Sequence, residues 1–226
     1  MINFHTLHWD NIPEDFVNAH KSVMEHFEIP VAYYNLNADH GSWMNTVMQN
    51  TNEEVIGFFD IDCVPLSKEK IEEIIEFARI NDTFVGCVQT SNHIPPFIHT
   101  FAAPSFFVIT KSCWEKLGMP SFKQALRWDV GEKVSYVAED HWKRYRCLYP
   151  DCYEREPVEG IWRLHNYGLY GIGTVFENTV YHLYQGRIPA NRDLFIQRCN
   201  EIVNGTFSTE GFHSCKDWNY KGRIVE

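Results

Sequence analysis

The chain has 226 residues, with 30 acidic and 20 basic side chains and a formal net charge of -10. This charge argues against binding nucleic acid through a broad positive surface, so an anionic ligand would need a local cation. The length fits one domain over residues 1–226, and no stretch approaches the roughly 20 apolar residues of a membrane span.

The beginning of the sequence, MINFHTLHWDNIPEDF, lacks a basic segment followed by a long apolar run. The seven cysteines are scattered and form no Cys-x-x-Cys pair, which favours free thiols over a disulfide frame or a zinc site. We therefore expect a cytoplasmic protein. Its oligomeric state is left open by the sequence.

Strand and helix patterns alternate through the first 90 residues. The expected order is a strand at 2–8, a helix at 13–27, a strand at 30–36, a helix at 40–51, a strand at 54–60, a helix after Ser67 and a strand at 83–89. This order is typical of a mostly parallel central sheet with helices on both faces, so we predict an α/β, Rossmann-like fold.

The regular alternation of strand and helix patterns ends after residue 90. We expect a strand at 105–109, a short helix from Thr110, a helix at 129–147, irregular or short-strand structure at 151–180 and a helix at 189–204. The pattern indicates a nucleotide-type half, residues 1–90, followed by a more variable half, residues 91–226, within one domain.

Two acids end the most apolar strand-like run. Asp60 and Asp62 close the segment EVIGFFDID, and ligands of parallel α/β sheets bind outside the carboxyl ends of the strands. Residues at i and i+2 share a face of a strand, and paired carboxylates suit Mg²⁺ or Mn²⁺ together with ligand phosphates. The alternative is that Asp62 caps a turn before Pro65 while Asp60 hydrogen-bonds within a loop.

The segment around this pair resembles the central signature of GT-A-fold glycosyltransferases. In IGFFDIDCVPLSKEKIEEII, a strand ends in Asp-x-Asp and a proline-containing turn and a helix follow. The likeness covers most of residues 1–185 in the order of elements, including NADHGSWMNTVMQNT upstream and APSFFVITKSCWEKLGMPSF downstream. It implies transfer of a sugar from a nucleotide diphosphate sugar, such as a UDP- or GDP-sugar, to an acceptor hydroxyl, with Mn²⁺ or Mg²⁺ as cofactor.

The resemblance also implies roles on the donor side. Asp62 would bind the metal, Asp60 would bind the metal or the ribose, and His182 in ENTVYHLYQGR would be the third ligand. His165, in WRLHNYG, competes with His182 for that role. The expected nucleotide-sugar contacts are Thr6, His8, Asn37, Gly41, Asn45, Asp60 and Arg187, the last paired with the leaving diphosphate.

On the acceptor side, the matching segment is WDVGEKVSYVAED. Asp129 is the best match for a carboxylate that accepts the hydroxyl proton as general base, with Glu132 or Asp140 as substitutes. Asp129 and Glu132 also form an Asp-x-x-Glu capping box, which would start the helix without any catalytic role. Both readings can hold at once, and the sequence leaves open whether transfer retains or inverts the anomeric centre.

Two other classes of function compete. FFDIDCVP also fits the opening motif of haloacid-dehalogenase phosphatases, in which the first Asp is the nucleophile. That family usually carries the motif on its first strand, whereas here it follows two strand-helix units and no clear Gly-Asp-x-x-x-Asp motif comes later. The third hypothesis is a carbohydrate-binding domain without turnover.

Overall fold

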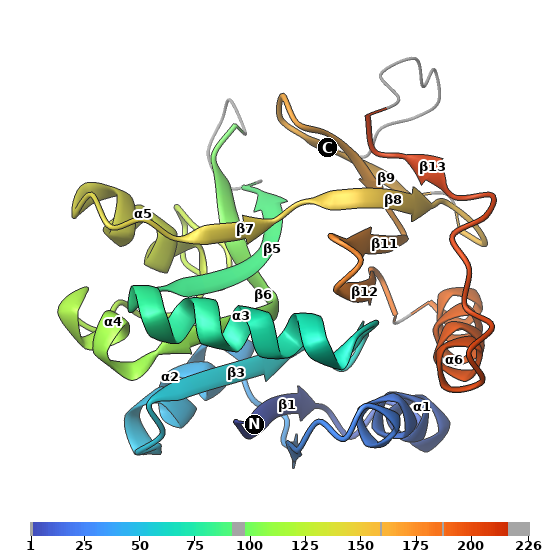
Figure 1. The fold of residues 1–226 in the computed structure, drawn as a ribbon, viewed down its shortest axis with the longest axis horizontal. Coiled ribbons are helices and arrows are strands. Elements are labelled where there is room, and N and C mark those ends of the chain that lie inside the picture. Colours follow the sequence, from blue (N-terminus) through green and yellow to red (C-terminus); the bar gives the residue numbers. More distant parts are fainter. Residues whose placement is uncertain (1, 92–97, 159, 187, 217–226) are drawn as a thin grey trace.

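The computed structural model describes residues 2–91, 98–158, 160–186 and 188–216 (Figure 1). The larger sheet has the strand order β2-β1-β3-β6-β5-β7. Its strands are β1 (Phe4–His8), β2 (Val31–Asn35), β3 (Val55–Phe59), β5 (Phe84–Thr90), β6 (Thr100–Thr110) and β7 (Arg146–Leu148). β1 pairs in parallel with β2 and β3, β5 pairs in parallel with β7, and β6 runs antiparallel to both of its neighbours. The predicted α/β class with a mostly parallel central sheet is confirmed.

Helices cover both faces of this sheet. They are α1 (Glu14–His26), α2 (His40–Asn50), α3 (Lys68–Asn81), α4 (Lys111–Lys116) and α5 (Glu132–Asp140). A further helix, α6 (Pro189–Val203), packs instead against α1. Alternate residues of β3 enter two different cores: Val55 and Phe59 pack with apolar residues of α3, whereas Ile56 and Phe58 pack with those of α2, α4 and α5. Burial on both faces explains why β3 reads as a continuous apolar run.

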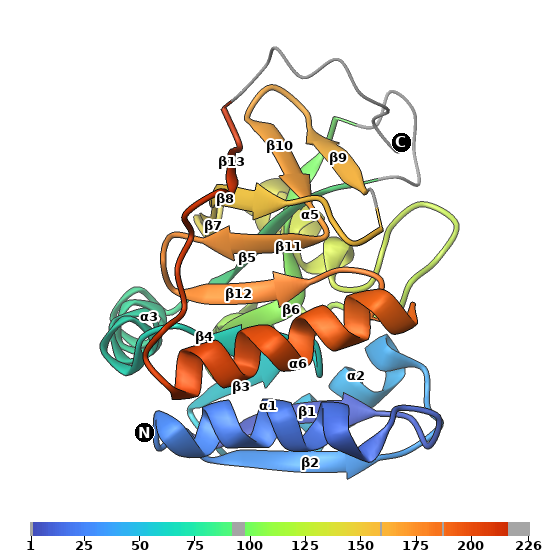
Figure 2. The ribbon, with the colours of Figure 1, turned by 90° about the vertical axis from the view of Figure 1, so that its right-hand side faces the viewer.

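A second sheet stands beside the first. Its order is β13-β8-β11-β12-β4, and all of its neighbouring strands are antiparallel. The strands are β4 (Cys63–Pro65), β8 (Pro150–Glu154), β11 (Gly173–Phe176), β12 (Val180–Leu183) and β13 (His213–Ser214), and β9 (Ile161–Leu164) forms a separate hairpin with β10 (Gly168–Gly171). α1 and α6 run side by side along this part of the molecule (Figure 2). Phe16 of α1 stacks on Phe195 of α6 in the core beneath them.

Local capping explains where two helices begin. The Ser67 hydroxyl accepts from the backbone N–H of Lys70 at the start of α3, and the Thr110 hydroxyl accepts from that of Cys113 at the start of α4. A side-chain oxygen that satisfies a free N–H of the first turn stabilises a helix by about 1 kcal/mol. The helix starts expected after Ser67 and near Thr110 are confirmed.

Two predicted boundaries are wrong. The strand expected at 105–109 spans residues 100–110, because the sheet absorbs Pro104 at an irregularity where the β5 register shifts between Gly86 and Cys87. The helix expected at 129–147 spans only residues 132–140. The chain turns at Trp142, which has a left-handed φ of 56°, and then adds β7 to the sheet edge beside β5.

No helix within the described residues is long and apolar enough to cross a membrane.

Candidate metal centre and its surroundings

The acid pair lies in a tight turn where the chain passes from the larger sheet to the second sheet. β3 ends at Phe59, the N–H of Asp60 donates to the carbonyl of Ser105 (2.8 Å), and the N–H of Cys63 donates to the carbonyl of Asp60 (3.0 Å). β4 then starts at Cys63. The sequence suggested a plain turn here. In the structure the residues after the turn form the short strand β4, whose pairing with β12 fixes their position.

Strand pairing brings His182 to the acid pair. His182 of β12 is the register partner of Cys63 in β4, and the N–H of Leu183 donates to the carbonyl of Asp62 (2.9 Å). As a result, His182 Nε2 lies 3.4 Å from Asp62 Oδ1. One ligand atom from each of Asp60, Asp62 and His182 lies within 4.8 Å of the other two. The structure thus brings together the three residues that the sequence suggested as metal ligands.

The donor set fits a divalent cation. Two carboxylate oxygens and one imidazole nitrogen suit Mn²⁺, and the carboxylates also suit Mg²⁺. His182 is 6% exposed, and its buried Nδ1 has no hydrogen-bond partner among the described residues. Burial and the charge of Asp62 raise the pKa of Asp60 to about 8, although His182 opposes the shift. Two acids held this close favour a cation between them.

A second histidine, which the sequence analysis missed, also contacts the acid pair. His40 is the first residue of α2, and its Nε2 lies 3.3 Å from Asp60 Oδ1. Burial lowers the pKa of His40 to about 4, although the charges of Asp62 and Asp39 oppose the shift. The imidazole is therefore neutral near pH 7. Its only sequence signal was its position directly after the N-cap Asp39.

His20 holds the backbone next to Asp62. This histidine of α1 is fully buried, and burial lowers its pKa to about 3. Its Nε2 lies 3.1 Å from the carbonyl of Cys63, which can only accept, so Nε2 carries the proton. Its Nδ1, 2.8 Å from the hydroxyl of Tyr33, then accepts from that hydroxyl. His20 thereby fixes the start of β4.

Similar folds occur among solved structures. The galactosyltransferase LgtC in complex with donor and acceptor sugar analogs is 10% identical over 92% of this chain and 97% of that chain, with a TM-score of 0.45. A197 from STIV is 12% identical over 81% of this chain and 94% of that chain, with a TM-score of 0.44. A glycosyltransferase involved in the glycosylation of the major capsid of PBCV-1 is 15% identical over 50% of this chain and 62% of that chain, with a TM-score of 0.32.

Comparison with protein-family models and with curated protein sequences gave no match.

The remaining donor-side candidates have different surroundings. Thr6 and His8 lie on β1, beside β3, and both Thr6 Oγ1 and His8 Nδ1 are buried without a hydrogen-bond partner in the described parts of the chain. Asn37 instead joins two loops: its Nδ2 donates to Asp10 Oδ2 (2.9 Å), and its Oδ1 accepts from the N–H of Asp10 (3.4 Å). Arg187 lies outside the described residues.

Gly41 and Asn45 hold α2 against the segment of residues 121–123. A Cβ on Gly41 would lie 2.4 Å from the carbonyl oxygen of Phe122, so only glycine fits there without a shift. Asn45 donates from Nδ2 to the Ser121 hydroxyl (2.9 Å) and accepts the N–H of Phe122 at Oδ1 (3.0 Å). These contacts fix the helix whose first residue touches Asp60.

The acceptor-side acids have different surroundings. Asp129 Oδ1 accepts from the N–H of Val130 (2.8 Å), and burial together with the Asp129 charge raises the pKa of Tyr170. Glu132 is fully buried as the first residue of α5, and its Oε2 accepts from the N–H of Asp129 (2.7 Å). The expected capping box is wrong, because Gly131, with a left-handed φ of 78°, is the N-cap and no side chain caps the helix. Asp140 is exposed at the end of α5.

A row of aromatic rings leads away from His182 of the metal cluster. The Tyr170 ring centroid lies 5.2 Å from that of Tyr184, and the Tyr184 centroid lies 4.1 Å from that of His182. Trp162 stacks on Tyr170 at 5.6 Å. Tyr170, whose pKa is raised by burial and by the charge of Asp129, is therefore linked through Tyr184 to His182.

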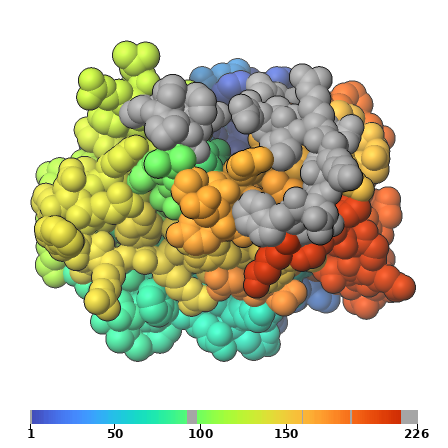
Figure 3. All heavy atoms as spheres, turned by 90° about the horizontal axis from the view of Figure 1, so that it is seen from above, coloured from blue at the N-terminus to red at the C-terminus, as the bar shows by residue number. Residues whose placement is uncertain are grey.

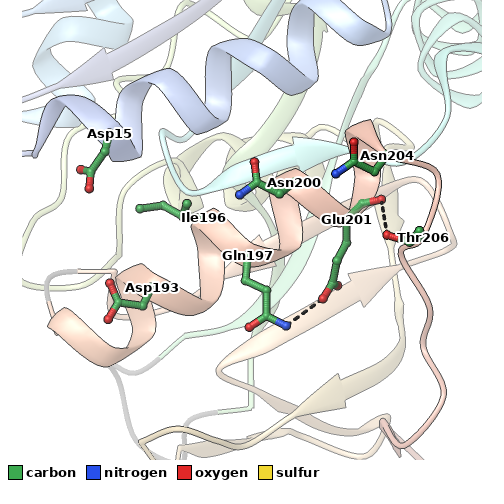
Figure 4. A pocket seen from close by; sticks show the side chains of 8 residues that line it. All are labelled: Asp15, Asp193, Ile196, Gln197, Asn200, Glu201, Asn204 and Thr206. Atoms are coloured by element: carbon green, nitrogen blue, oxygen red, sulfur yellow. Dashed lines mark hydrogen bonds between the residues drawn. The ribbon is translucent and has the colours of Figure 1, made fainter.

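Two concave surfaces lie elsewhere. Figure 4 shows a pocket of about 510 Å³ along α6, facing Asp15 of α1; most of the residues that line it are polar, and none is a predicted site residue. An open groove of about 970 Å³ is lined by His99, Tyr136, Glu139, Tyr145 and His165, among others. On the face shown in Figure 3, the yellow surface that includes α5 and the orange surface of the β9–β10 region adjoin each other. His165 lines this groove, and the Asp60–Asp62–His182 cluster does not include it.

Proposed function

We propose that this protein is a metal-dependent glycosyltransferase that moves a sugar from a nucleotide diphosphate sugar, such as a UDP- or GDP-sugar, to an acceptor hydroxyl. The observation that carries the proposal is the convergence of Asp60, Asp62 and His182 where β3 ends. The carboxyl end of a strand is where an α/β sheet offers a ligand site, and this donor set suits Mn²⁺ or Mg²⁺.

Electrostatics supports this assignment. A chain with a formal net charge of -10 repels a free diphosphate, and two of its acids lie side by side in the cluster. A divalent cation, when bound there, would neutralise charge on the departing diphosphate. Asp60 and Asp62 would supply hard oxygen ligands, and His182 would supply a neutral nitrogen ligand from the adjoining sheet.

On the acceptor side, Asp129 is the proposed partner of the acceptor hydroxyl. Its carboxylate would accept the hydroxyl proton if the sugar is inverted in one displacement, or orient the acceptor if the configuration is retained. Glu132 is not proposed for this role, because it is fully buried and both of its oxygens are hydrogen-bonded. Asp140 is exposed at the end of α5, and no contact with the described residues favours it.

Calorimetric titration with Mn²⁺ and UDP- or GDP-sugars tests the proposal. Asp62→Ala should abolish Mn²⁺-dependent donor binding while circular dichroism shows the fold intact. Asp193→Ala, which removes an exposed acid of α6, is the matched control and should bind as the wild type does. Undiminished binding by Asp62→Ala would remove the metal site from the proposal.

Activity assays separate the competing functions. Donor hydrolysis or transfer that requires Mn²⁺ supports the transferase. Phosphate release from p-nitrophenyl phosphate would support the phosphatase instead, and sugar binding without either activity would support a binding domain. A thermal-shift screen of nucleotide diphosphate sugars with and without Mn²⁺ narrows the donor, because a ligand that binds the native state raises Tm.

A further inference from the structure

A fully buried carboxylate ties three separate segments together next to Asp129. Glu132 Oε2 accepts from the Ser91 hydroxyl (3.1 Å) and from the N–H of Asp129 (2.7 Å), and Glu132 Oε1 lies 2.7 Å from His99 Nδ1. Ser91 directly follows β5, and His99 directly precedes β6. The Asp-x-x-Glu pattern in the sequence accounts for only one of these three contacts. The other two join α5 to the central sheet.

His99 is itself held on several sides. Its Nε2 lies 3.3 Å from both carboxylate oxygens of Glu139, and its ring stacks on Tyr136 with the centroids 3.8 Å apart. The Tyr145 hydroxyl donates to Glu139 Oε1 (2.5 Å). An imidazole between two carboxylates donates from both nitrogens, so His99 acts as the cation of this network.

Breaking this network would displace Asp129. A buried carboxylate that loses one hydrogen-bond partner costs far more than the net value of one bond, so the surrounding segments shift to find a new partner. The segment that begins at Asp129 is bonded directly to Glu132 through its N–H, so it would shift. Because Asp129 is the proposed acceptor-side acid, a shift of its backbone would change its distance from the metal cluster.

We propose that His99 and Glu132 are positioning residues that hold Asp129 in place for transfer. This inference rests on the function proposed above for Asp129. Neither residue would touch a substrate: Glu132 acts through the backbone N–H of Asp129, and His99 acts through Glu132.

The proton on His99 supplies a readout that a merely structural role would not give. Burial lowers its pKa, but hydrogen bonds to Glu132 and Glu139 outweigh that effect and raise the pKa to about 9. The polar groups around the His99 network are Ser91, Glu132, Tyr136, Glu139 and Tyr145, and Arg144, Arg146 and His165 line the same groove. The rate of transfer should therefore fall as the pH rises through about 9, where Glu132 loses its cationic partner.

The test compares His99→Gln, Glu132→Gln and the control His141→Gln, which replaces an exposed histidine at the end of α5. Transfer kinetics with a UDP-sugar and Mn²⁺ should show kcat lowered at least about tenfold in the first two variants, since small misplacements of a reacting group can cost 10²-fold. Their Mn²⁺ affinity should be unchanged, and His99→Gln should lose the fall in rate near pH 9. The control should match the wild type.

Hydrogen exchange of the peptide that contains Asp129 supplies a second measurement, which does not need activity. Exchange should be faster in His99→Gln and Glu132→Gln than in the wild type and in His141→Gln. If the wild type shows no transfer, the proposed function fails. Faster exchange in the two variants would still support the inference that His99 and Glu132 hold Asp129 in place. Unchanged exchange together with unchanged kcat and pH profile in either folded variant would overturn the inference.

Discussion

The imidazole of His40 lies 3.3 Å from the carboxylate of Asp60, although the two residues belong to different elements. His40 starts α2, and its ring stacks on Trp43 with the centroids 5.5 Å apart. Trp43 is buried with its ring edge-on to Phe58 of β3. Packing therefore fixes the imidazole independently of Asp60, so a proposed metal ligand has a rigid neighbour.

This contact predicts a loss of metal affinity in His40→Ala. Residues that contact ligating carboxylates typically contribute 10–100-fold to metal affinity. We expect the Kd for Mn²⁺, measured by calorimetry, to rise about tenfold. His26→Ala, at the exposed end of α1, is the control. An unchanged Kd in His40→Ala would show that Asp60 does not depend on this neighbour.

The two histidines that competed for the third ligand position can be distinguished directly. His182→Ala removes a nitrogen from the cluster and should weaken Mn²⁺ binding by more than about tenfold. His165→Ala changes the groove near Tyr167 and should leave Mn²⁺ binding at the wild-type level. Titration followed by the electron paramagnetic resonance of free Mn²⁺ measures both variants. Equal loss in the two would contradict the assignment of His182.

Gly41 is expected to tolerate no side chain. In Gly41→Ala the new Cβ would lie 2.4 Å from the carbonyl oxygen of Phe122 and 2.6 Å from Cα of Lys123, both of which are backbone atoms. Overpacking of this kind costs about 1–3 kcal/mol. Urea unfolding should show this loss, whereas Gln49→Ala, at an exposed position of the same helix, should change the free energy of unfolding by less than about 0.5 kcal/mol.

His99 should make the stability of the fold depend on pH. Its pKa is raised from 6.5 to about 9 in the folded protein, so the folded state binds the proton more tightly than the unfolded chain does. The stabilisation is fully present below about pH 6.5 and is lost as the pH rises through about 9.

Urea unfolding at a series of pH values tests the direction of this change in stability with pH. The difference in stability between wild type and His99→Gln should shrink as the pH rises across that window. A difference in stability that stays constant across this pH range would show that the proton on His99 does not stabilise the fold.

The sequence alone determined the elements whose signals are local. Alternation over four or five residues, a 3.6-residue apolar stripe and side-chain caps such as Ser67 act within one turn or one strand. The order from β1 to β5, apart from the short strand β4, followed from these signals, as did the position of Asp60 and Asp62 at the end of β3. The pair was recognisable because two acids interrupt a run that is buried on both faces.

The sequence named His182 and His165 as candidates for the third ligand, and only the tertiary structure decided that His182 meets the pair and that His40 joins it. His182 reaches Asp62 through the pairing of β12 with β4, across about 120 positions of sequence, and His40 reaches Asp60 through the packing of α2. The early end of α5 likewise depends on the docking of β7 beside β5. Strand register and helix docking are set by the fit of whole surfaces, and no short stretch of sequence encodes that fit.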